Sequence, residues 1–232
     1  METILECRNL SLNYGPNPAL QNVNLSIAAG GIVGLLGPNG SGKTTLIKSI
    51  MGMLQPREGQ IFIDGKAPSP ETKAITAYLP DANYLCKWMR VKEQLDYYAD
   101  FFADFQRDRA LAMLERLGIG LNQKIKTLSK GNQEKLGLIF TMSRNAKLYI
   151  LDEPIAGVDP AARDFILDTI LKNKPADATI FLCTHLIWDI EPVLTHAVFL
   201  NCGRVVMDAP VDEIREKEGK SLNDVFREVF RW

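Results

Sequence analysis

Residues 37–44 read Gly37-Pro38-Asn39-Gly40-Ser41-Gly42-Lys43-Thr44 and match the pattern G-x-x-x-x-G-K-[ST]. The apolar run 32–36 precedes them, and a segment with helical character follows over 44–53. A strand, this loop and then a helix are the context in which the pattern forms a phosphate-binding loop. Glycine lets successive backbone N–H groups point at phosphate oxygens, and the helix N-terminus adds a partial positive charge. The sequence therefore predicts an α/β fold with a phosphate-binding loop.

Two side chains of this loop carry the predicted chemistry. Lys43 is expected to reach the β- and γ-phosphates of a nucleotide, and the Thr44 hydroxyl is expected to ligate Mg²⁺. The alternative is a glycine-rich turn that matches the pattern by chance, which the flanking strand and helix argue against. The residues expected to contact the nucleotide here are Gly37, Pro38, Asn39, Gly40, Ser41, Gly42, Lys43, Thr44 and Thr45.

A second apolar run, 148–151, ends in two carboxylates, Asp152 and Glu153. Asp152 is placed to hold Mg²⁺, and Glu153 to orient or deprotonate an attacking water. The alternative is an ordinary strand end with two solvated acids. Downstream of a phosphate-binding loop, the pair indicates nucleotide hydrolysis.

Composition bounds the classes of protein to which the chain can belong. Of its 232 residues, 46% are hydrophobic and 24% are charged, which excludes a disordered chain or a disulfide scaffold. The net charge of -1 argues against a dedicated nucleic-acid binder. Four scattered cysteines indicate a reduced, cytosolic protein. We expect no secretory signal and no membrane span, so any membrane contact would come through a partner.

Hydrophobic periodicity divides the chain into segments. Alternation over 1–30 predicts antiparallel strands, and the character becomes helical over 83–146. Further strands are expected over 61–63, 75–79, 148–151 and 179–183, with a hairpin over 197–206. Helices are expected over 91–105, 109–117, 128–144, from Asp159-Pro160 onward, and over 221–232, where Ser221 and Asp224 form a capping box. The buried face predicted for the first of these helices comprises Val91, Leu95, Tyr98, Phe102 and Phe105.

Further short motifs follow in a fixed order. Leu128-Ser129-Lys130-Gly131-Asn132 precedes a predicted helix, Asp152-Glu153-Pro154-Ile155-Ala156-Gly157-Val158-Asp159 follows a strand, and Thr184-His185 ends another. With these motifs, nearly the whole chain resembles the nucleotide-binding subunit of ATP-binding cassette (ABC) transporters. The first motif resembles the family signature Leu-Ser-Gly-Gly-Gln, and His185 resembles the switch histidine. Tyr14 stands where the family places an aromatic residue that stacks on adenine.

The resemblance implies a fold and a domain organisation. The fold would be an α/β, RecA-like P-loop NTPase core with an N-terminal antiparallel β subdomain and an inserted α-helical subdomain. Residues 1–232 would form one ABC ATPase domain. Its core with the β subdomain would comprise 1–80 and 147–232, and the helical signature subdomain would comprise 81–146.

The resemblance also assigns roles to residues. Glu153, His185 and Lys43 would be catalytic. Two chains would stack head to tail, so that Ser129 and Gly131 of one chain reach the ATP held by the other. Asp159 would reach across the same interface, a role compatible with capping the helix that follows it. The alternatives are a strand-end residue for His185 and ordinary packing for Tyr14. His196 matches no motif and is expected to be structural.

The sequence departs from the family pattern at two sites. Asp81 follows Tyr78-Leu79-Pro80, where the family has glutamine, and would offer a charged ligand to Mg²⁺ together with Thr44 and Asp152. Lys130 replaces the first signature glycine, and Asn132 replaces the glutamine. Lys130 is expected to point to solvent rather than toward a γ-phosphate, because exposure is usual for lysine.

The predicted function is that of an ATP-binding and ATP-hydrolysing subunit. It would use ATP and Mg²⁺ to power a separate transmembrane permease through ATP-driven pairing with an identical or related chain. The hairpin at Gly203 and the ending 221–226 resemble bacterial exporter-type subunits, and the permease would hold the chain at the inner face of the cell membrane. Alternatives are a soluble ABC protein that regulates or remodels a cytosolic complex, and an inactive binding module suggested by Asp81 and Lys130.

Two groups of aromatic residues in the helical segment admit more than one interpretation. Tyr84, Trp88 and Met89 would either form a groove for a helix of the permease or cap the helical core. Tyr97 and Phe101 would lie off the buried face as incidental surface or as packing residues.

Overall fold

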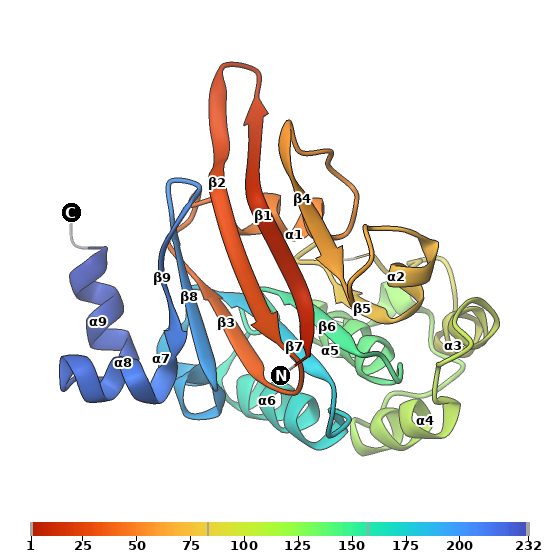
Figure 1. The fold of residues 1–232 in the computed structure, drawn as a ribbon. Helices are drawn as coiled ribbons and strands as arrows, with labels where there is room; N and C mark the ends of the chain where they lie inside the picture. Colours follow the sequence, from red (N-terminus) through yellow and green to blue (C-terminus); the bar gives the residue numbers. More distant parts are fainter. Residues whose placement is uncertain (1, 83, 157, 231–232) are drawn as a thin grey trace.

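Nine strands form two sheets in the part of the chain that the computed structural model describes, residues 2–82, 84–156 and 158–230 (Figure 1). The smaller sheet is antiparallel, has the order β2-β1-β4, and consists of β1 (Thr3–Tyr14), β2 (Asn17–Ala28) and β4 (Glu58–Ile63). The larger sheet has the order β5-β6-β7-β3-β8-β9. It consists of β3 (Ile32–Leu36), β5 (Thr76–Leu79), β6 (Leu148–Asp152), β7 (Thr179–Thr184), β8 (His196–Asn201) and β9 (Arg204–Pro210). Its strands are parallel except for the edge strand β9.

The helices cover the sheets and extend the molecule at both ends (Figure 1). They are α1 (Lys43–Ile50), α2 (Pro70–Ala74), α3 (Val91–Phe101), α4 (Arg107–Arg116), α5 (Lys130–Met142), α6 (Pro160–Asn173), α7 (Ile187–Ile190), α8 (Val211–Glu218) and α9 (Leu222–Val229), with 3-10 turns at Ile125–Thr127 and Glu191–Val193. Helices α3 and α4 lie at one end, and α8 and α9 lie at the other. In the described residues, no helix combines the length and the apolarity needed to cross a bilayer.

Strand β3 is buried on both of its faces, which explains why the sequence 32–36 is apolar without interruption. Val33 and Leu35 pack with α1 and the smaller sheet, whereas Ile32 and Leu36 pack on the opposite face with α5 and α6. Side chains alternate across a strand, so a strand that is covered on both faces must be apolar at every position. This confirms the predicted parallel strand, which brings the phosphate-binding loop to the centre of the larger sheet.

The helical segment has its own core, and its first helix is shorter than predicted. Val91, Leu95 and Tyr98 are buried as expected. The helix ends at Phe101 rather than at residue 105, because Phe102 is extended and Phe105 forms a bridge with Arg144. The predicted apolar face still packs, since Phe105 is buried and Phe102 packs against the same cluster.

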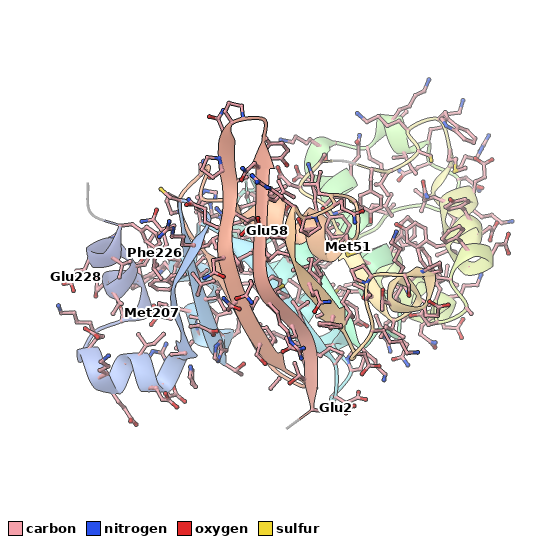
Figure 2. The ribbon with its side chains drawn as sticks, turned by 45° about the horizontal axis from the view of Figure 1, so that its top comes forward. Glu2, Met51, Glu58, Met207, Phe226 and Glu228 are labelled. Carbon is pink, nitrogen blue, oxygen red and sulfur yellow. The ribbon has the colours of Figure 1, made fainter. Side chains whose placement is uncertain are left out.

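The predicted capping box of helix α9 forms in part. Ser221 Oγ accepts the Asp224 N–H, but the Asp224 carboxylate accepts from the Ser221 hydroxyl instead of the Ser221 N–H. Phe226 points toward the β8–β9 hairpin, which carries Met207 (Figure 2), and its ring lies 5.5 Å from that of Phe199. Val229, on the same helix, is exposed. Helices α2, α7 and α8 were not predicted. Asn83, Gly157 and Trp232, which fall in predicted segments, lie outside the described residues.

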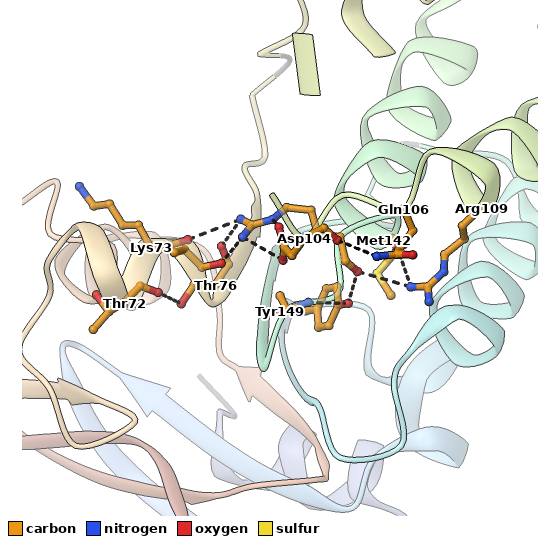
Figure 3. A network of polar contacts seen from close by, with 11 residues as sticks. Thr72, Lys73, Thr76, Asp104, Gln106, Arg109, Met142 and Tyr149 are labelled. Atoms are coloured by element: carbon orange, nitrogen blue, oxygen red, sulfur yellow. Dashed lines mark hydrogen bonds and ion pairs between the residues drawn. The ribbon is translucent and has the colours of Figure 1, made fainter. Parts of the chain in front are cut away.

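A buried polar cluster joins the helical segment to the larger sheet (Figure 3). Arg144 is 3% exposed, and its Nε donates to Asp104 Oδ1 over 2.9 Å. Its guanidinium also donates to the carbonyls of Ala74 and Thr76. The Tyr149 hydroxyl donates to the Arg144 carbonyl over 2.5 Å and accepts the N–H of Ala146. These side-chain groups therefore have protein partners.

Candidate nucleotide site

The loop 37–44 joins the carboxyl end of β3 to the N-terminus of α1. Gly42 has a φ of +107°, and a Cβ there would lie 2.7 Å from the Ala19 carbonyl oxygen, so glycine is required. Lys43 is buried, and its Nζ donates to the carbonyls of Gly37 over 2.7 Å and Pro38 over 3.1 Å. These bonds hold the ammonium group over the loop, where the sequence predicted a phosphate.

The carboxylate of Asp152 lies at the carboxyl end of β6 and is 1% exposed. Neither of its oxygens has a hydrogen-bond partner in the described part of the protein, and the same holds for Ser41 Oγ. Burial raises the pKa of Asp152, and the negative charge of Asp81 raises it further, whereas the nearby Cys183 thiol and Thr44 hydroxyl, which lie outside hydrogen-bond geometry, lower it. Buried oxygens without partners are rare in native proteins and indicate a missing ligand. Oxygen donors are the ones that Mg²⁺ prefers, so Asp152 and the adjacent Thr44 fit this ion.

Glu153 is held by the end of the neighbouring strand β7. Its φ of +51° is unusual for a residue other than glycine. Its N–H donates to the Cys183 carbonyl over 2.8 Å, and Thr184 Oγ1 donates to its Oε2 over 3.1 Å. His185 Nδ1 lies 3.0 Å from both carboxylate oxygens. The structure thus brings Glu153, His185 and Thr184 together, while the catalytic roles of Glu153 and His185 stay predictions.

Thr184 was not predicted to have a role, since in the motif Thr184-His185 only the histidine carries the resemblance. A signal was present, because Thr184 is a polar residue at the end of an otherwise apolar strand. Such a buried hydroxyl needs partners.

A single cleft brings together most of the predicted nucleotide-binding residues. Its walls also include residues 17–19, at the start of β2, which the sequence analysis missed because they match no motif. Tyr14, at the rim, is 51% exposed. The predicted residues that line the cleft are Tyr14, Asn39, Gly40, Gly42, Lys43, Thr44, Thr45, Asp81 and Glu153.

The role of Asp81 as a metal ligand stays a prediction. Asp81 lines the cleft with Thr44. Within the described ranges, however, no three His, Cys, Asp or Glu side chains converge closely enough to hold a metal ion by themselves. Any Mg²⁺ would therefore depend on further oxygens, such as the Thr44 hydroxyl and the phosphates of a nucleotide.

The signature residues lie outside this cleft. Ser129 is exposed and caps α5, since its Oγ accepts the Asn132 N–H over 3.2 Å. A Cβ at Gly131 would meet no atom within 4 Å, so the fold of the described chain does not require glycine there. The side chain of Lys130 is 85% exposed in the single chain and its Nζ lies 3.7 Å from Glu134 Oε1, so its predicted orientation to solvent rather than to a γ-phosphate stays a prediction. Asp159 is also exposed, and its carbonyl accepts the Arg163 N–H at the start of α6.

The remaining candidates do not extend the cleft. Trp88 is exposed on the surface, whereas the Tyr84 hydroxyl donates to the Gly137 carbonyl of α5 over 2.9 Å. Tyr97 and Phe101 are exposed and stack on each other at 5.8 Å. His196 Nε2 lies 2.5 Å from Asp208 Oδ1 on the neighbouring strand, which agrees with a structural role.

Comparison with known proteins agrees with the motifs. Residues 20–156 match the family model described as ABC transporter. The chain is 30% identical to the uncharacterized ABC transporter ATP-binding protein YdbJ of Bacillus subtilis (strain 168), over 97% of this chain and 75% of YdbJ. It is 28% identical to the ABC-type transporter ATP-binding protein EcsA of the same organism, over 98% of this chain and 96% of EcsA.

Solved structures show the same fold. An ATP-binding subunit of an ABC transporter superposes with a TM-score of 0.89 at 32% identity, covering 98% of this chain and all of that chain. This likeness confirms the predicted P-loop NTPase fold. Family, fold and site agree, and we conclude that the chain belongs to the ABC transporter family as a nucleotide-binding ATPase subunit.

Proposed function

We propose that this chain hydrolyses ATP to power export through a separate transmembrane permease, and that two such chains close around ATP during each cycle. The export direction is supported by the names of two relatives. The chain is 27% identical to the SkfA peptide export ATP-binding protein SkfE of Bacillus subtilis (strain 168), over 99% of this chain. It is 28% identical to the Nod factor export ATP-binding protein I of Cupriavidus metallidurans, over 94% of this chain. The permease would hold the ATPase at the inner face of the membrane.

The observation that carries the pairing is the place of the signature residues. Ser129 and Gly131 lie outside the cleft that Lys43, Thr44 and Glu153 share. The N-terminus of α5 favours an anion. A glycine that the chain's own packing does not require leaves room for another molecule at Gly131. A second chain that presents its own cleft to Ser129 and Gly131 would account for both features, and Asp159 would contribute to the same interface.

The residues that line the cleft, together with Asp152 and His185 beside Glu153, would divide the chemistry among them. The backbone of the loop and Lys43 bind the phosphates, and Tyr14 contacts the base. Thr44, Asp152 and Asp81 would hold Mg²⁺, which neutralises charge on the β- and γ-phosphate oxygens when bound. Glu153 orients the attacking water and accepts its proton, and His185 holds the Glu153 carboxylate and the γ-phosphate in place.

Glu153→Gln tests this function. The variant is expected to bind ATP, to lose nearly all turnover, and to form more dimer with ATP than the wild type, because the γ-phosphate persists. Turnover and light-scattering mass with ATP and with ADP measure these effects. Glu216→Gln, at an exposed glutamate of α8, is the matched control and is expected to behave as wild type. Wild-type turnover in Glu153→Gln would contradict the proposal, and so would a variant that stays monomeric with ATP.

Purification from membranes tests the permease. A tagged chain is expected to bring down a polytopic membrane protein in detergent. Recovery with only soluble partners would instead favour a regulator of a cytosolic complex.

A further inference from the structure

We propose that Thr184 is a positioning residue for hydrolysis: its hydroxyl fixes the carboxylate of Glu153 and so sets the rate of turnover without contributing to nucleotide binding. The inference rests on the role of Glu153 in the proposed function. It concerns a residue that neither the loop pattern nor the switch histidine accounts for.

The end of β7 holds Glu153 at three points in succession. The Cys183 carbonyl accepts its N–H over 2.8 Å, Thr184 Oγ1 donates to its Oε2 over 3.1 Å, and His185 Nδ1 lies 3.0 Å from each of its carboxylate oxygens. Glu153 needs this support because its backbone turns through a left-handed conformation directly after β6. Such a conformation persists only where the surroundings fix it.

Thr184 is the more rigid of the two side chains that hold the carboxylate. It is fully buried as the last residue of β7, in register with Leu36 of β3. The side chain of His185 is 42% exposed, so packing restrains it less than it restrains Thr184. A β-branched side chain is restricted at χ1, and a fully buried one has little space to change rotamer, so packing holds the Thr184 hydroxyl in place.

A second hydrogen bond sets the direction of the Thr184 hydroxyl. Thr184 Oγ1 accepts the Leu186 N–H over 3.1 Å. With one lone pair used in this way, the hydroxyl proton is directed to Glu153 Oε2. A hydrogen bond to a carboxylate is stronger than one between neutral groups. The other oxygen, Oε1, lies 3.0 Å from His185 Nδ1. A carboxylate oxygen has a further lone pair, so Oε1 can also accept from a water molecule in an orientation that the fold has already set.

Thr184 itself does not line the nucleotide cleft in the described part of the chain. Loss of its hydroxyl is therefore expected to slow the chemical step and to leave ATP affinity unchanged. Substitution of a residue that mattered only for folding would not slow the chemical step while leaving ATP affinity unchanged.

The experiment compares Thr184→Val, which keeps the shape and removes the hydroxyl, with Thr184→Ser, which keeps the hydroxyl. For Thr184→Val we expect kcat to fall about tenfold, the effect of one lost hydrogen bond to a charged group, with KM within about twofold of wild type. Thr184→Ser is expected to restore most of the rate. Thr184→Ala, which introduces no new methyl group in place of the hydroxyl, repeats the test if the valine variant melts at a lower temperature.

Thr179→Val is the matched control. Thr179 is buried at the other end of the same strand, and its Oγ1 accepts the Gly30 N–H over 2.9 Å, away from the cleft. This variant is expected to lose stability and to keep its kcat. Wild-type kcat in Thr184→Val, an equally slow Thr184→Ser, or a KM that rises as kcat falls would each overturn the proposal.

The variant Glu153→Gln distinguishes a failure of the role proposed for Thr184 from a failure of the role proposed for Glu153. If Glu153→Gln is inactive and Thr184→Val is as fast as wild type, only the role of Thr184 is refuted. If Glu153→Gln turns over normally, the proposed role of Glu153 fails first. In the Glu153→Gln background, Thr184→Val is expected to cause no further loss, because both changes act through one carboxylate.

Discussion

The two ends of strand β6 carry buried polar groups that differ in how they are satisfied. Near its start, Tyr149 and the preceding Arg144 have hydrogen-bond partners, among them the carboxylate of Asp104. At its end, Asp152 is buried just as deeply, yet neither carboxylate oxygen has a partner in the described residues. Ser41, on the adjacent loop, has an equally unpartnered hydroxyl.

This difference distinguishes polar groups that stabilise the fold from polar groups that are available to bind a ligand. A buried polar group contributes to stability only when it is hydrogen-bonded. The Arg144 cluster meets that condition and joins the helical segment to the larger sheet. The Asp152 carboxylate does not meet it, so its burial costs stability that a bound ion would recover. Substitutions at the two ends should therefore have opposite effects on stability and activity.

Arg144→Leu should produce the largest loss of stability. The substitution leaves Asp104 and the carbonyls of Ala74 and Thr76 without their donor, and breaking a buried ion pair costs about 3–5 kcal/mol. Urea unfolding measures the loss. Arg227→Leu, at an exposed arginine of α9, is the control and is expected to change stability little. Equal effects of the two changes would remove the special role of the Arg144 cluster.

Asp152→Asn should lower activity without lowering stability, in contrast to Arg144→Leu. Turnover is expected to fall about a hundredfold or more, because a neutral amide is a poor ligand for Mg²⁺, while the free energy of unfolding stays unchanged or rises. Mg²⁺-dependent ATP turnover and urea unfolding measure the two effects. A variant that loses stability as Arg144→Leu does would show that Asp152 has a structural role instead.

The stability of Asp152→Asn relative to wild type should also depend on pH. Burial raises the folded-state pKa of Asp152 above its unfolded-state value of about 4. The charged carboxylate therefore costs stability at neutral pH, and this cost disappears as the pH falls below the unfolded-state pKa. The stability gain of Asp152→Asn over wild type should be larger at pH 7 than at pH 4. A constant difference would contradict the assignment.

The two ends also differ in how far the sequence could predict them. Asp152, Glu153 and the loop 37–44 were predictable because their chemistry is set by neighbours in the chain: an apolar strand before them, and glycines or a second acid beside them. The Arg144 cluster was not, because Arg144 donates to carbonyls 68 and 70 positions away in the sequence. No local sequence pattern predicts such a contact. Thr184 is an intermediate case, visible in the sequence only as a polar residue that ends an apolar strand.

The helices and strands likewise differ in whether a local sequence pattern could predict them. Strands β3 and β6 followed from uninterrupted apolar runs, whereas the short helices α2 and α8 carried too few apolar positions for periodicity to show. The end of α3 at Phe101 depended on the bridge between Phe105 and Arg144, which is again a tertiary contact. Local patterns thus set the elements that position the nucleotide site, while long-range contacts set how the helical segment joins them.

Tyr149→Phe should give a smaller loss than Arg144→Leu. It removes one hydroxyl that donates to the Arg144 carbonyl and accepts the Ala146 N–H, leaving the ring in place. The expected cost is about 1–2 kcal/mol in urea unfolding, with kcat unchanged. An effect on turnover without a loss of stability would contradict the separation of the two ends.

Ser41→Ala is the matched change at the other end and should have the smallest effect on stability. Its hydroxyl is as buried as that of Tyr149 but has no partner in the described chain, so its removal breaks no hydrogen bond. We expect the free energy of unfolding to change by less than about 0.5 kcal/mol, and the rise in melting temperature caused by Mg²⁺ and ATP to become smaller. A loss of stability equal to that of Tyr149→Phe would show that the unpartnered hydroxyl serves the fold after all. An unchanged rise in melting temperature would show that Ser41 does not contact the nucleotide or its ion.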